Sequence, residues 1–210
     1  MKPGGNSAFQ AWLAADAMAG PQRAHRLAIR LPDLMRPLGR TAVMRADWAL
    51  AHSLFWRGHF VASLELLDAL KPEVITPATD AAFDHVNLAL LIAAQSSWTL
   101  AALGRHTAAL EQAETLFDRL QLSTTPLDRA YASHALGLLH CLLDQPEAAL
   151  VWSRAAQTGA AVDLNHSAVV LEYWALASLS QPTDEPAVQT ALAALRRLGH
   201  AQEARAFSLY

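Results

Sequence analysis

In half-buried strands apolar and polar positions alternate, and such alternation is nearly absent from this chain. Alanine and leucine dominate the apolar positions and β-branched residues are sparse, which favours helix over strand. The pattern predicts an all-α fold along the whole chain.

Start signals divide the chain into separate helices. Thr125 can cap a helix that has Pro126 in its first position and Asp128 in its first turn, where a carboxylate suits the free N–H groups. Thr-Asp at 79–80 and Thr-Asp-Glu-Pro at 183–186 are signals of the same kind. The proline-rich segments KPEVITP and SQPTDEP are predicted loops.

Short turns recur along the chain at intervals of about 40 residues. The turns begin at Gly58, Gly104 and Asp144, and a weaker one lies at 181–183. Small residues recur five positions after and seven positions before the first three turns, at Ser63, Ala109 and Ala149 and at Ala51, Ser97 and Gly137. Two antiparallel helices need small residues where their backbones cross closely, so each unit is predicted to be a helical hairpin.

These units resemble tetratricopeptide repeats, which have a small residue in the first helix, a G-x-Y/F turn and an alanine five residues after the glycine. The segments that carry the resemblance are LAHSLFWRGHFVAS, SSWTLAALGRHTAA and GLLHCLLDQPEAA. It covers residues 41–160, and 165–198 as a degenerate hairpin in which Trp174 and Pro186 replace small residues. The units exceed the usual period of about 34 residues, as in arrays attached to bacterial transcription regulators and nucleotide cyclases.

The resemblance implies a right-handed superhelical array of helical hairpins, an α-solenoid. Residues 1–40 are then an N-terminal helical cap, formed by 7–40, and residues 41–210 are the array of about four hairpins. Gly199 is expected to end the last long helix, and AQEARAFSLY after it to form a short final helix. Repetition lets neighbouring hairpins cover apolar faces that one hairpin cannot bury alone.

Aromatic and polar side chains form a stripe on the first helix of the first hairpin. Trp48, His52 and Trp56 recur every fourth residue and therefore project from one face. The resemblance places that face on the concave side of the array. Adding the corresponding positions of the next two hairpins gives a candidate groove of Trp48, His52, Trp56, Gln95, Trp98, Tyr131 and His134. Ordinary core is an equal alternative for such residues.

Some tetratricopeptide domains hold a C-terminal carboxylate with asparagines and lysines. The equivalent positions here are Trp48, His52, Gln95, Tyr131 and Ala135, so that clamp is missing and a chaperone-tail ligand is not expected.

Composition indicates extensive burial. Hydrophobic residues make up 53% of the chain and charged residues 17%, below the roughly 25% of an average soluble domain. Burial within the array or against a partner follows, and self-association as a homodimer is expected. The apolar run at 88–94 is too short to span a membrane, and the N-terminal segment is too polar for a signal peptide, so a cytoplasmic location is expected.

Charge and reactive residues give little sign of nucleic-acid binding or catalysis. The net charge of −3 gives no general reason to bind nucleic acid, and Arg23, Arg26 and Arg30 form either a solvated helix face or an acidic docking surface. Cys141 is the single cysteine, expected as a buried thiol rather than as a nucleophile paired with His134 or His140. The chain lacks H-E-x-x-H and phosphate-binding or dinucleotide-binding glycine motifs, so no catalytic residue, metal or cofactor is predicted.

The sequence thus favours a non-enzymatic protein-interaction module that binds a peptide or helix in a concave aromatic groove. The alternative is a sensory or autoregulatory domain of a bacterial signalling or transcription-regulatory protein, which binds a small effector or its own output domain.

Overall fold

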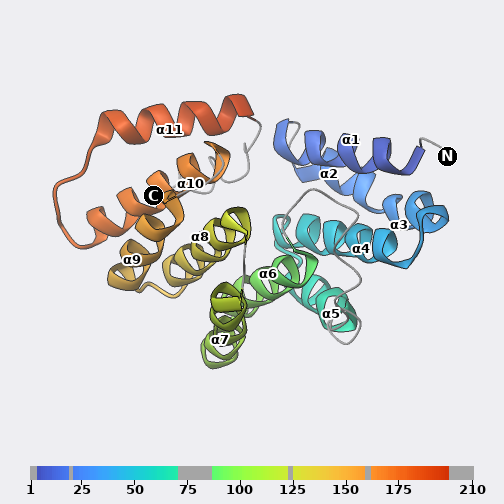
Figure 1. Ribbon diagram of the computed structural model, residues 1–210, viewed down its shortest axis with the longest axis horizontal. Helices are drawn as coiled ribbons and strands as arrows, with labels where there is room; N and C mark the ends of the chain where they lie inside the picture. Colours follow the sequence, from blue (N-terminus) through green and yellow to red (C-terminus); the bar gives the residue numbers. More distant parts are fainter. Residues whose placement is uncertain (1–3, 19–20, 71–86, 123–124, 159–161, 199–210) are drawn as a thin grey trace.

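The computed structural model describes residues 4–18, 21–70, 87–122, 125–158 and 162–198, and these ranges form helices with no strand (Figure 1). In chain order the α-helices are α1 (Gly4–Met18), α2 (Pro21–Ala28), α3 (Leu31–Met35), α4 (Arg40–Phe55), α5 (Phe60–Leu70), α6 (Leu88–Ala102), α7 (His106–Leu122), α8 (Pro126–Leu142), α9 (Pro146–Gln157), α10 (Val162–Ser178) and α11 (Glu185–Leu198). A 3₁₀ helix, η1 (Arg36–Leu38), follows α3. The all-α prediction is confirmed. Among the described helices, none combines the length and the hydropathy needed to cross a bilayer.

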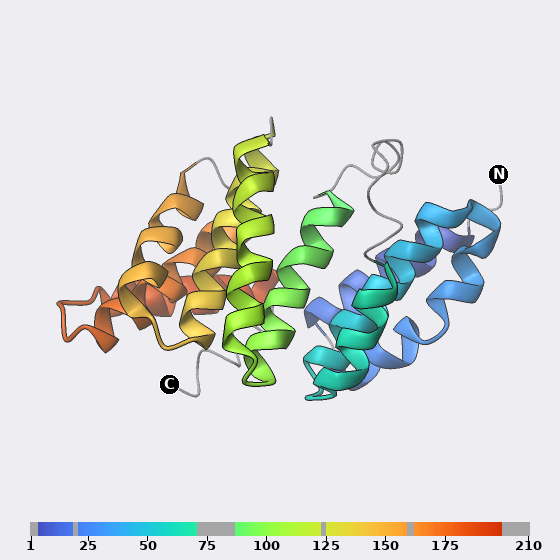
Figure 2. The same cartoon turned by 90° about the horizontal axis from the view of Figure 1, so that it is seen from below.

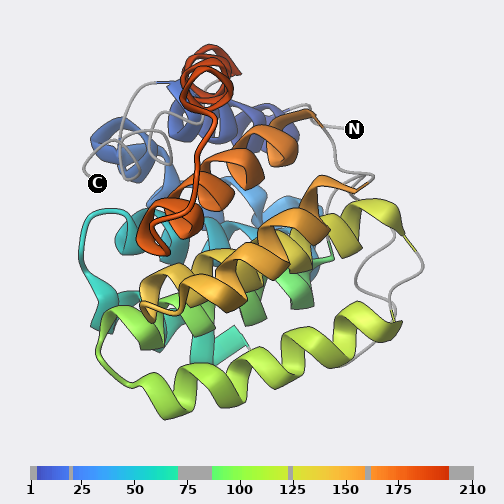
Figure 3. The ribbon, with the colours of Figure 1, turned by 90° about the vertical axis from the view of Figure 1, so that its left-hand side faces the viewer.

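The helices from α4 onward are paired as hairpins, α4 with α5, α6 with α7, α8 with α9 and α10 with α11. The first helices of neighbouring hairpins also contact one another, from α4 through α6 and α8 to α10. The helices follow an arc in Figure 1, and Figure 2 shows the hairpins side by side along it. Figure 3 views the arc from the side of its last hairpin, where α11 returns to contact α1.

One turn geometry connects the helices of all four hairpins. Two or three residues after the end of each first helix comes a residue with a positive φ: 80° at Gly58, 72° at Gly104, 54° at Asp144 and 53° at Ser180. In each turn the next residue donates its N–H to a carbonyl five residues back, as in a Schellman motif. These bonds run from His59 to Leu54, Arg105 to Leu100, Gln145 to His140 and Gln181 to Leu176, with N···O distances of 2.9 Å. The weaker fourth turn therefore exists, beginning at Ser180 rather than at residue 181.

Two helix starts follow the predicted signals. The Thr125 hydroxyl accepts the N–H of Asp128 at 3.0 Å, and α8 begins at Pro126. A carboxylate oxygen of Asp184 accepts the N–H of Ala187 at 3.0 Å, and α11 begins at Glu185. The signal at 79–80, the expected stop at 199 and the expected helix at 201–210 lie outside the described residues.

Small residues mark the helix crossings, as predicted. The buried hydroxyl of Ser63 donates to the carbonyl oxygen of Ala51 at 2.8 Å, which joins α5 to α4. In the third hairpin, a Cβ atom on Gly137 would lie 3.5 Å from the backbone nitrogen of Ser153 and 3.4 Å from Leu171 Cδ1. Larger side chains at these positions would separate the two helices.

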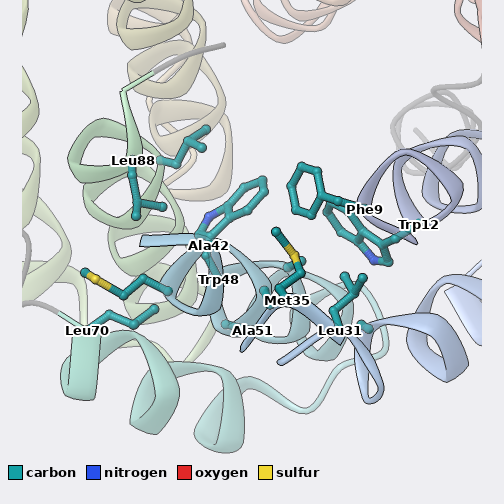
Figure 4. Close-up of a cluster of buried hydrophobic side chains, with 14 of the residues drawn as sticks. Phe9, Trp12, Leu31, Met35, Ala42, Trp48, Ala51, Leu70 and Leu88 are labelled. Atoms are coloured by element: carbon teal, nitrogen blue, oxygen red, sulfur yellow. The ribbon is translucent and has the colours of Figure 1, made fainter. Parts of the chain in front are cut away.

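The N-terminal helices share a hydrophobic core with the first hairpin. Phe9 and Trp12 of α1, with Leu31 and Met35 of α3, belong to the same buried cluster as Trp48 of α4 (Figure 4). A second cluster continues from the end of α4 through α6 to α8, and a third lies between α10 and α11. Burial of apolar surface therefore joins the expected N-terminal cap to the rest of the chain.

Candidate functional site

Trp48, His52 and Trp56, which we call the aromatic stripe, form a continuous row on α4. The ring centroids of Trp48 and His52 are 5.3 Å apart, and those of His52 and Trp56 are 6.0 Å apart. Helical spacing of four residues produces this row, because residues i and i+4 lie one above the other on a helix face. Trp48 is buried, whereas His52 and Trp56 are half-buried.

His52 connects the aromatic stripe to α6 by hydrogen bonds. The indole Nε1 of Trp56 donates to His52 Nε2 at 2.9 Å, since an indole N–H can only donate. His52 Nδ1 then carries the hydrogen and donates to Gln95 Oε1, also at 2.9 Å. These bonds fix the orientation of the ring between its two neighbours.

Helix α1 covers the aromatic stripe. The Trp12 ring packs edge-on against Trp48, with centroids 5.8 Å apart, and against His52, at 6.1 Å. Phe9 packs on Trp12 at 5.3 Å, and both side chains are buried (Figure 4). Asp16 Oδ2 lies 3.3 Å from His52 Nε2, and an ion pair between them would need a protonated imidazole, which could no longer accept the Trp56 N–H.

Sequence reasoning did not connect α1 with the aromatic stripe. Phe9, Trp12 and Asp16 are spaced i, i+3 and i+7, which places them on one helix face, and this signal was available in the sequence. The periodicity of α1 does not identify the helix that its face contacts. These residues are the functional candidates that sequence analysis missed.

Trp98 is packed between helices. It is 4% exposed, contacts Phe55 with ring centroids 6.5 Å apart, and donates its indole N–H to the carbonyl oxygen of Ala135 at 2.9 Å. Sequence analysis left groove and core as equal alternatives, and the structure places Trp98 in the core where α4, α6 and α8 meet. Gln95 is also buried, at 1% exposed, but its side chain bonds with the aromatic stripe.

Tyr131 and His134 on α8 take different positions. Tyr131 is half-buried and packs against both large hydrophobic clusters. His134 is buried and lies 2.9 Å from the Ser167 hydroxyl on α10. The structure thus brings Trp48, His52, Trp56 and Gln95 together. The contact of His134 with Ser167 is instead directed to α10.

Three N–H donors at this site are buried and have no acceptor among the described residues: Trp12 Nε1, Trp48 Nε1 and Gln95 Nε2. A buried donor without an acceptor costs about 1–3 kcal/mol, because it has lost its hydrogen bond to water. The interface between α1 and the helices beneath it therefore leaves part of its hydrogen-bonding capacity unused.

Arg23, Arg26 and Arg30 are exposed at α2 and the turn after it. Helix α2, which carries Arg23 and Arg26, packs beside α1, and α1 covers the aromatic stripe. The basic face of these three arginines is solvated in this structure, and its availability to an acidic partner stays a prediction.

The described residues do not assemble groups for metal or nucleophilic chemistry. Within the described ranges, no cluster of three His, Cys, Asp or Glu side chains could hold a metal ion. Burial raises the pKa of the Cys141 thiol, which disfavours the reactive thiolate. His140 Nδ1 lies 2.7 Å from Gln145 Oε1, and His134 bonds with Ser167.

No protein-family model matches this chain, and comparison with curated proteins and with solved structures gives no significant match.

Proposed function

We propose that the chain is a non-enzymatic, tetratricopeptide-like module that binds a helix or peptide of a partner protein on the inner face of its helical array. The single observation that carries this proposal is the helix α1 lying on the aromatic stripe. Trp12 contacts both Trp48 and His52 there, and Asp16 lies beside His52 Nε2. A surface that already holds one helix by aromatic and polar contacts is suited to hold another.

The arrangement of the hairpins also supports the proposal. Contacts from α4 to α6, α8 and α10 make one row of first helices, with α5, α7 and α9 paired outside it. Tetratricopeptide arrays present such a row as their concave face. Partly exposed aromatic side chains on this row, at Trp56 and Tyr131, are of the kind that commonly anchor interfaces.

Capture from native cell extract tests the proposal. The wild-type chain is expected to retain a partner that Trp56→Ala loses, because Trp56 is half-buried on the aromatic stripe and contributes to its hydrogen bonding. Val151→Ala serves as the control, since Val151 is 64% exposed on α9. Retention of the same proteins by all three chains would contradict binding at the stripe, and retention of none would contradict the function.

An autoregulatory role has its own support. The helix that covers the aromatic stripe belongs to the same chain, so binding of a partner there competes with an internal contact. Limited proteolysis between α1 and α2, measured with and without the captured partner, distinguishes the two roles. Faster cleavage when the partner is bound is expected for autoregulation, and unchanged cleavage contradicts it.

A further inference from the structure

Helix α1 is attached through one face. Phe9, Trp12 and Ala15 are buried against its neighbours, while Ala11 and Ala14 on its other side are exposed. The hydrogen bonds of the α4–α5 crossing and of the later turns do not involve α1, so its release would keep the hairpins paired, although its contacts with α2, α3 and α11 would be lost.

The surface under α1 has unused hydrogen-bonding capacity. Trp48 belongs to the aromatic stripe and Gln95 is hydrogen-bonded to it, and Trp48 Nε1 and Gln95 Nε2 find no acceptor among the described residues. The part of α1 that the structure describes has one charged side chain, Asp16, and that carboxylate faces His52. A ligand that brings acceptors within reach of these nitrogens would satisfy donors that α1 leaves unsatisfied.

Charge beside the site favours an acidic ligand. Arg23, Arg26 and Arg30 are exposed on α2 and the turn after it, α2 packs beside α1, and the described part of α1 carries a single carboxylate. A helix with several carboxylates would gain attraction from this basic face, and the attraction would weaken as salt is added.

We infer that α1 is a displaceable internal ligand of the aromatic stripe, and that the partner it excludes is an acidic amphipathic helix. This helix carries an aromatic residue at position i, a tryptophan at i+3 and an acidic residue at i+7. This pattern is that of Phe9, Trp12 and Asp16. The inference rests on the function proposed above and names the class of partner for the same surface.

Tethering gives α1 an advantage that the partner must overcome. A segment joined by a short linker has an effective concentration in the range of about 1 mM or more. The apparent affinity of the partner is its intrinsic affinity reduced by the fraction of molecules in which α1 is undocked. A substitution that weakens the docking of α1 must therefore strengthen the binding of a separate helix peptide. A substitution in the aromatic stripe must weaken that binding.

The test uses the full-length chain and a fluorescent peptide of residues 4–18, followed by fluorescence anisotropy. Trp12→Ala in the protein is expected to bind the peptide at least about tenfold more tightly than wild type, because the internal competitor is lost. Gln10→Ala, at an exposed position of α1, is the matched control and should bind as wild type does. Trp48→Ala combined with Trp12→Ala should lose the binding.

A thermal readout separates displacement from simple damage. The peptide is expected to raise the melting temperature of the Trp12→Ala protein, and a peptide carrying Trp12→Ala is not. If Trp12→Ala disturbs the helical circular dichroism spectrum, Asp16→Ala replaces it in both the peptide-affinity and the melting experiments. Asp16 is only half-buried, so this substitution should disturb the fold less. Equal peptide affinity of the variant and wild type, or no thermal rescue, overturns the inference.

A second peptide tests the acidic character of the ligand. Gln10→Glu and Ala14→Glu place carboxylates at exposed positions of the helix. This peptide is expected to bind the Trp12→Ala protein more tightly than the native sequence at low salt, with the difference lost at high salt. Equal affinities at low salt contradict the acidic preference.

Two outcomes identify other occupants or sites. A concentration-dependent dimer of wild type that Trp12→Ala abolishes would make a second copy the occupant and overturn the inference. If the protein captured from extract is lost with Trp56→Ala but is not displaced by the residue 4–18 peptide, the proposed function stands and this inference fails.

Discussion

The indole nitrogen of Trp98 lies 2.9 Å from the carbonyl oxygen of Ala135 and donates a hydrogen bond to it across the interface of α6 and α8. A carbonyl inside a helix has a second lone pair, so it accepts this bond in addition to its helical one. The side chain is 4% exposed. Trp98 therefore holds two neighbouring hairpins together by both burial and hydrogen bonding.

Replacing Trp98 should strongly destabilise the fold. Trp98→Ala is expected to lower the free energy of unfolding by about 3–5 kcal/mol, through lost burial and the cavity left behind. Trp98→Phe keeps most of the burial, loses the hydrogen bond to Ala135, and should cost about 1–2 kcal/mol. Urea unfolding midpoints measure both, with the half-buried Trp152 replaced by alanine as the milder control. A loss below about 1 kcal/mol for Trp98→Ala would place this side chain on a surface instead.

Two turns can be stabilised by glycine. Asp144 and Ser180 have φ angles of 54° and 53°, in the left-handed region that glycine adopts without steric cost. Asp144→Gly and Ser180→Gly are each expected to raise the free energy of unfolding by about 0.5–1 kcal/mol. Gly58→Ala, at the equivalent position with a φ of 80°, should have the opposite effect. Thermal melts of the three variants check this, and a destabilised Ser180→Gly would argue against a common turn geometry.

Acid should weaken the contact between α2 and α4. Burial, then Arg57 and His59, lower the pKa of His25 below its usual 6.5. The unfolded chain therefore takes up this proton first as the pH falls below 6.5, and the stability of the folded state declines. His25 Nδ1 donates to Ser53 Oγ at 2.9 Å, because that hydroxyl itself donates to the Leu50 carbonyl.

Melting temperatures between pH 8 and pH 5 test the His25 prediction. His25→Asn can retain an N–H donor toward Ser53 but does not titrate, so its melting temperature should fall less than that of wild type over this range. Parallel pH profiles for the two proteins would exclude His25 as the source.

The thiol of Cys141 should react slowly in the folded protein. Burial raises its pKa, so the thiolate that attacks disulfide reagents is scarce at neutral pH. Reaction with an aromatic disulfide reagent is expected to be at least about tenfold slower in buffer than in urea. Similar rates in the two solvents would show that the folded environment does not protect Cys141.

Local features of the fold could be predicted from the sequence because they depend on local chemistry. Thr125 followed by Pro126 starts a helix as expected, and Gly58 and Gly104 occupy positive-φ turn positions. The fourth turn was placed one residue late, because Ser180 is not a residue type that signals a left-handed conformation. The pairing of Ser63 with Ala51 followed from their small size at a repeated distance from the turn.

Long-range placement was harder to predict. The spacing of Trp48, His52 and Trp56 indicated a common face, but not that α1 would cover it. Groove and core could not be separated for Trp98, because that depends on how closely α8 approaches α6. Helical periodicity describes one helix at a time, whereas burial depends on its neighbours.

The contact between α11 and α1 limits how this chain can change in length. In an open array, duplication of a hairpin adds a unit at little structural cost, because each unit contacts its neighbours alone. Here the last described helix returns to the first, so an additional hairpin would move α11 away from α1 and expose both surfaces. Gain or loss of a unit therefore carries a penalty at a distant site, and we expect evolution to alter this protein by substitution within its hairpins rather than by changing their number.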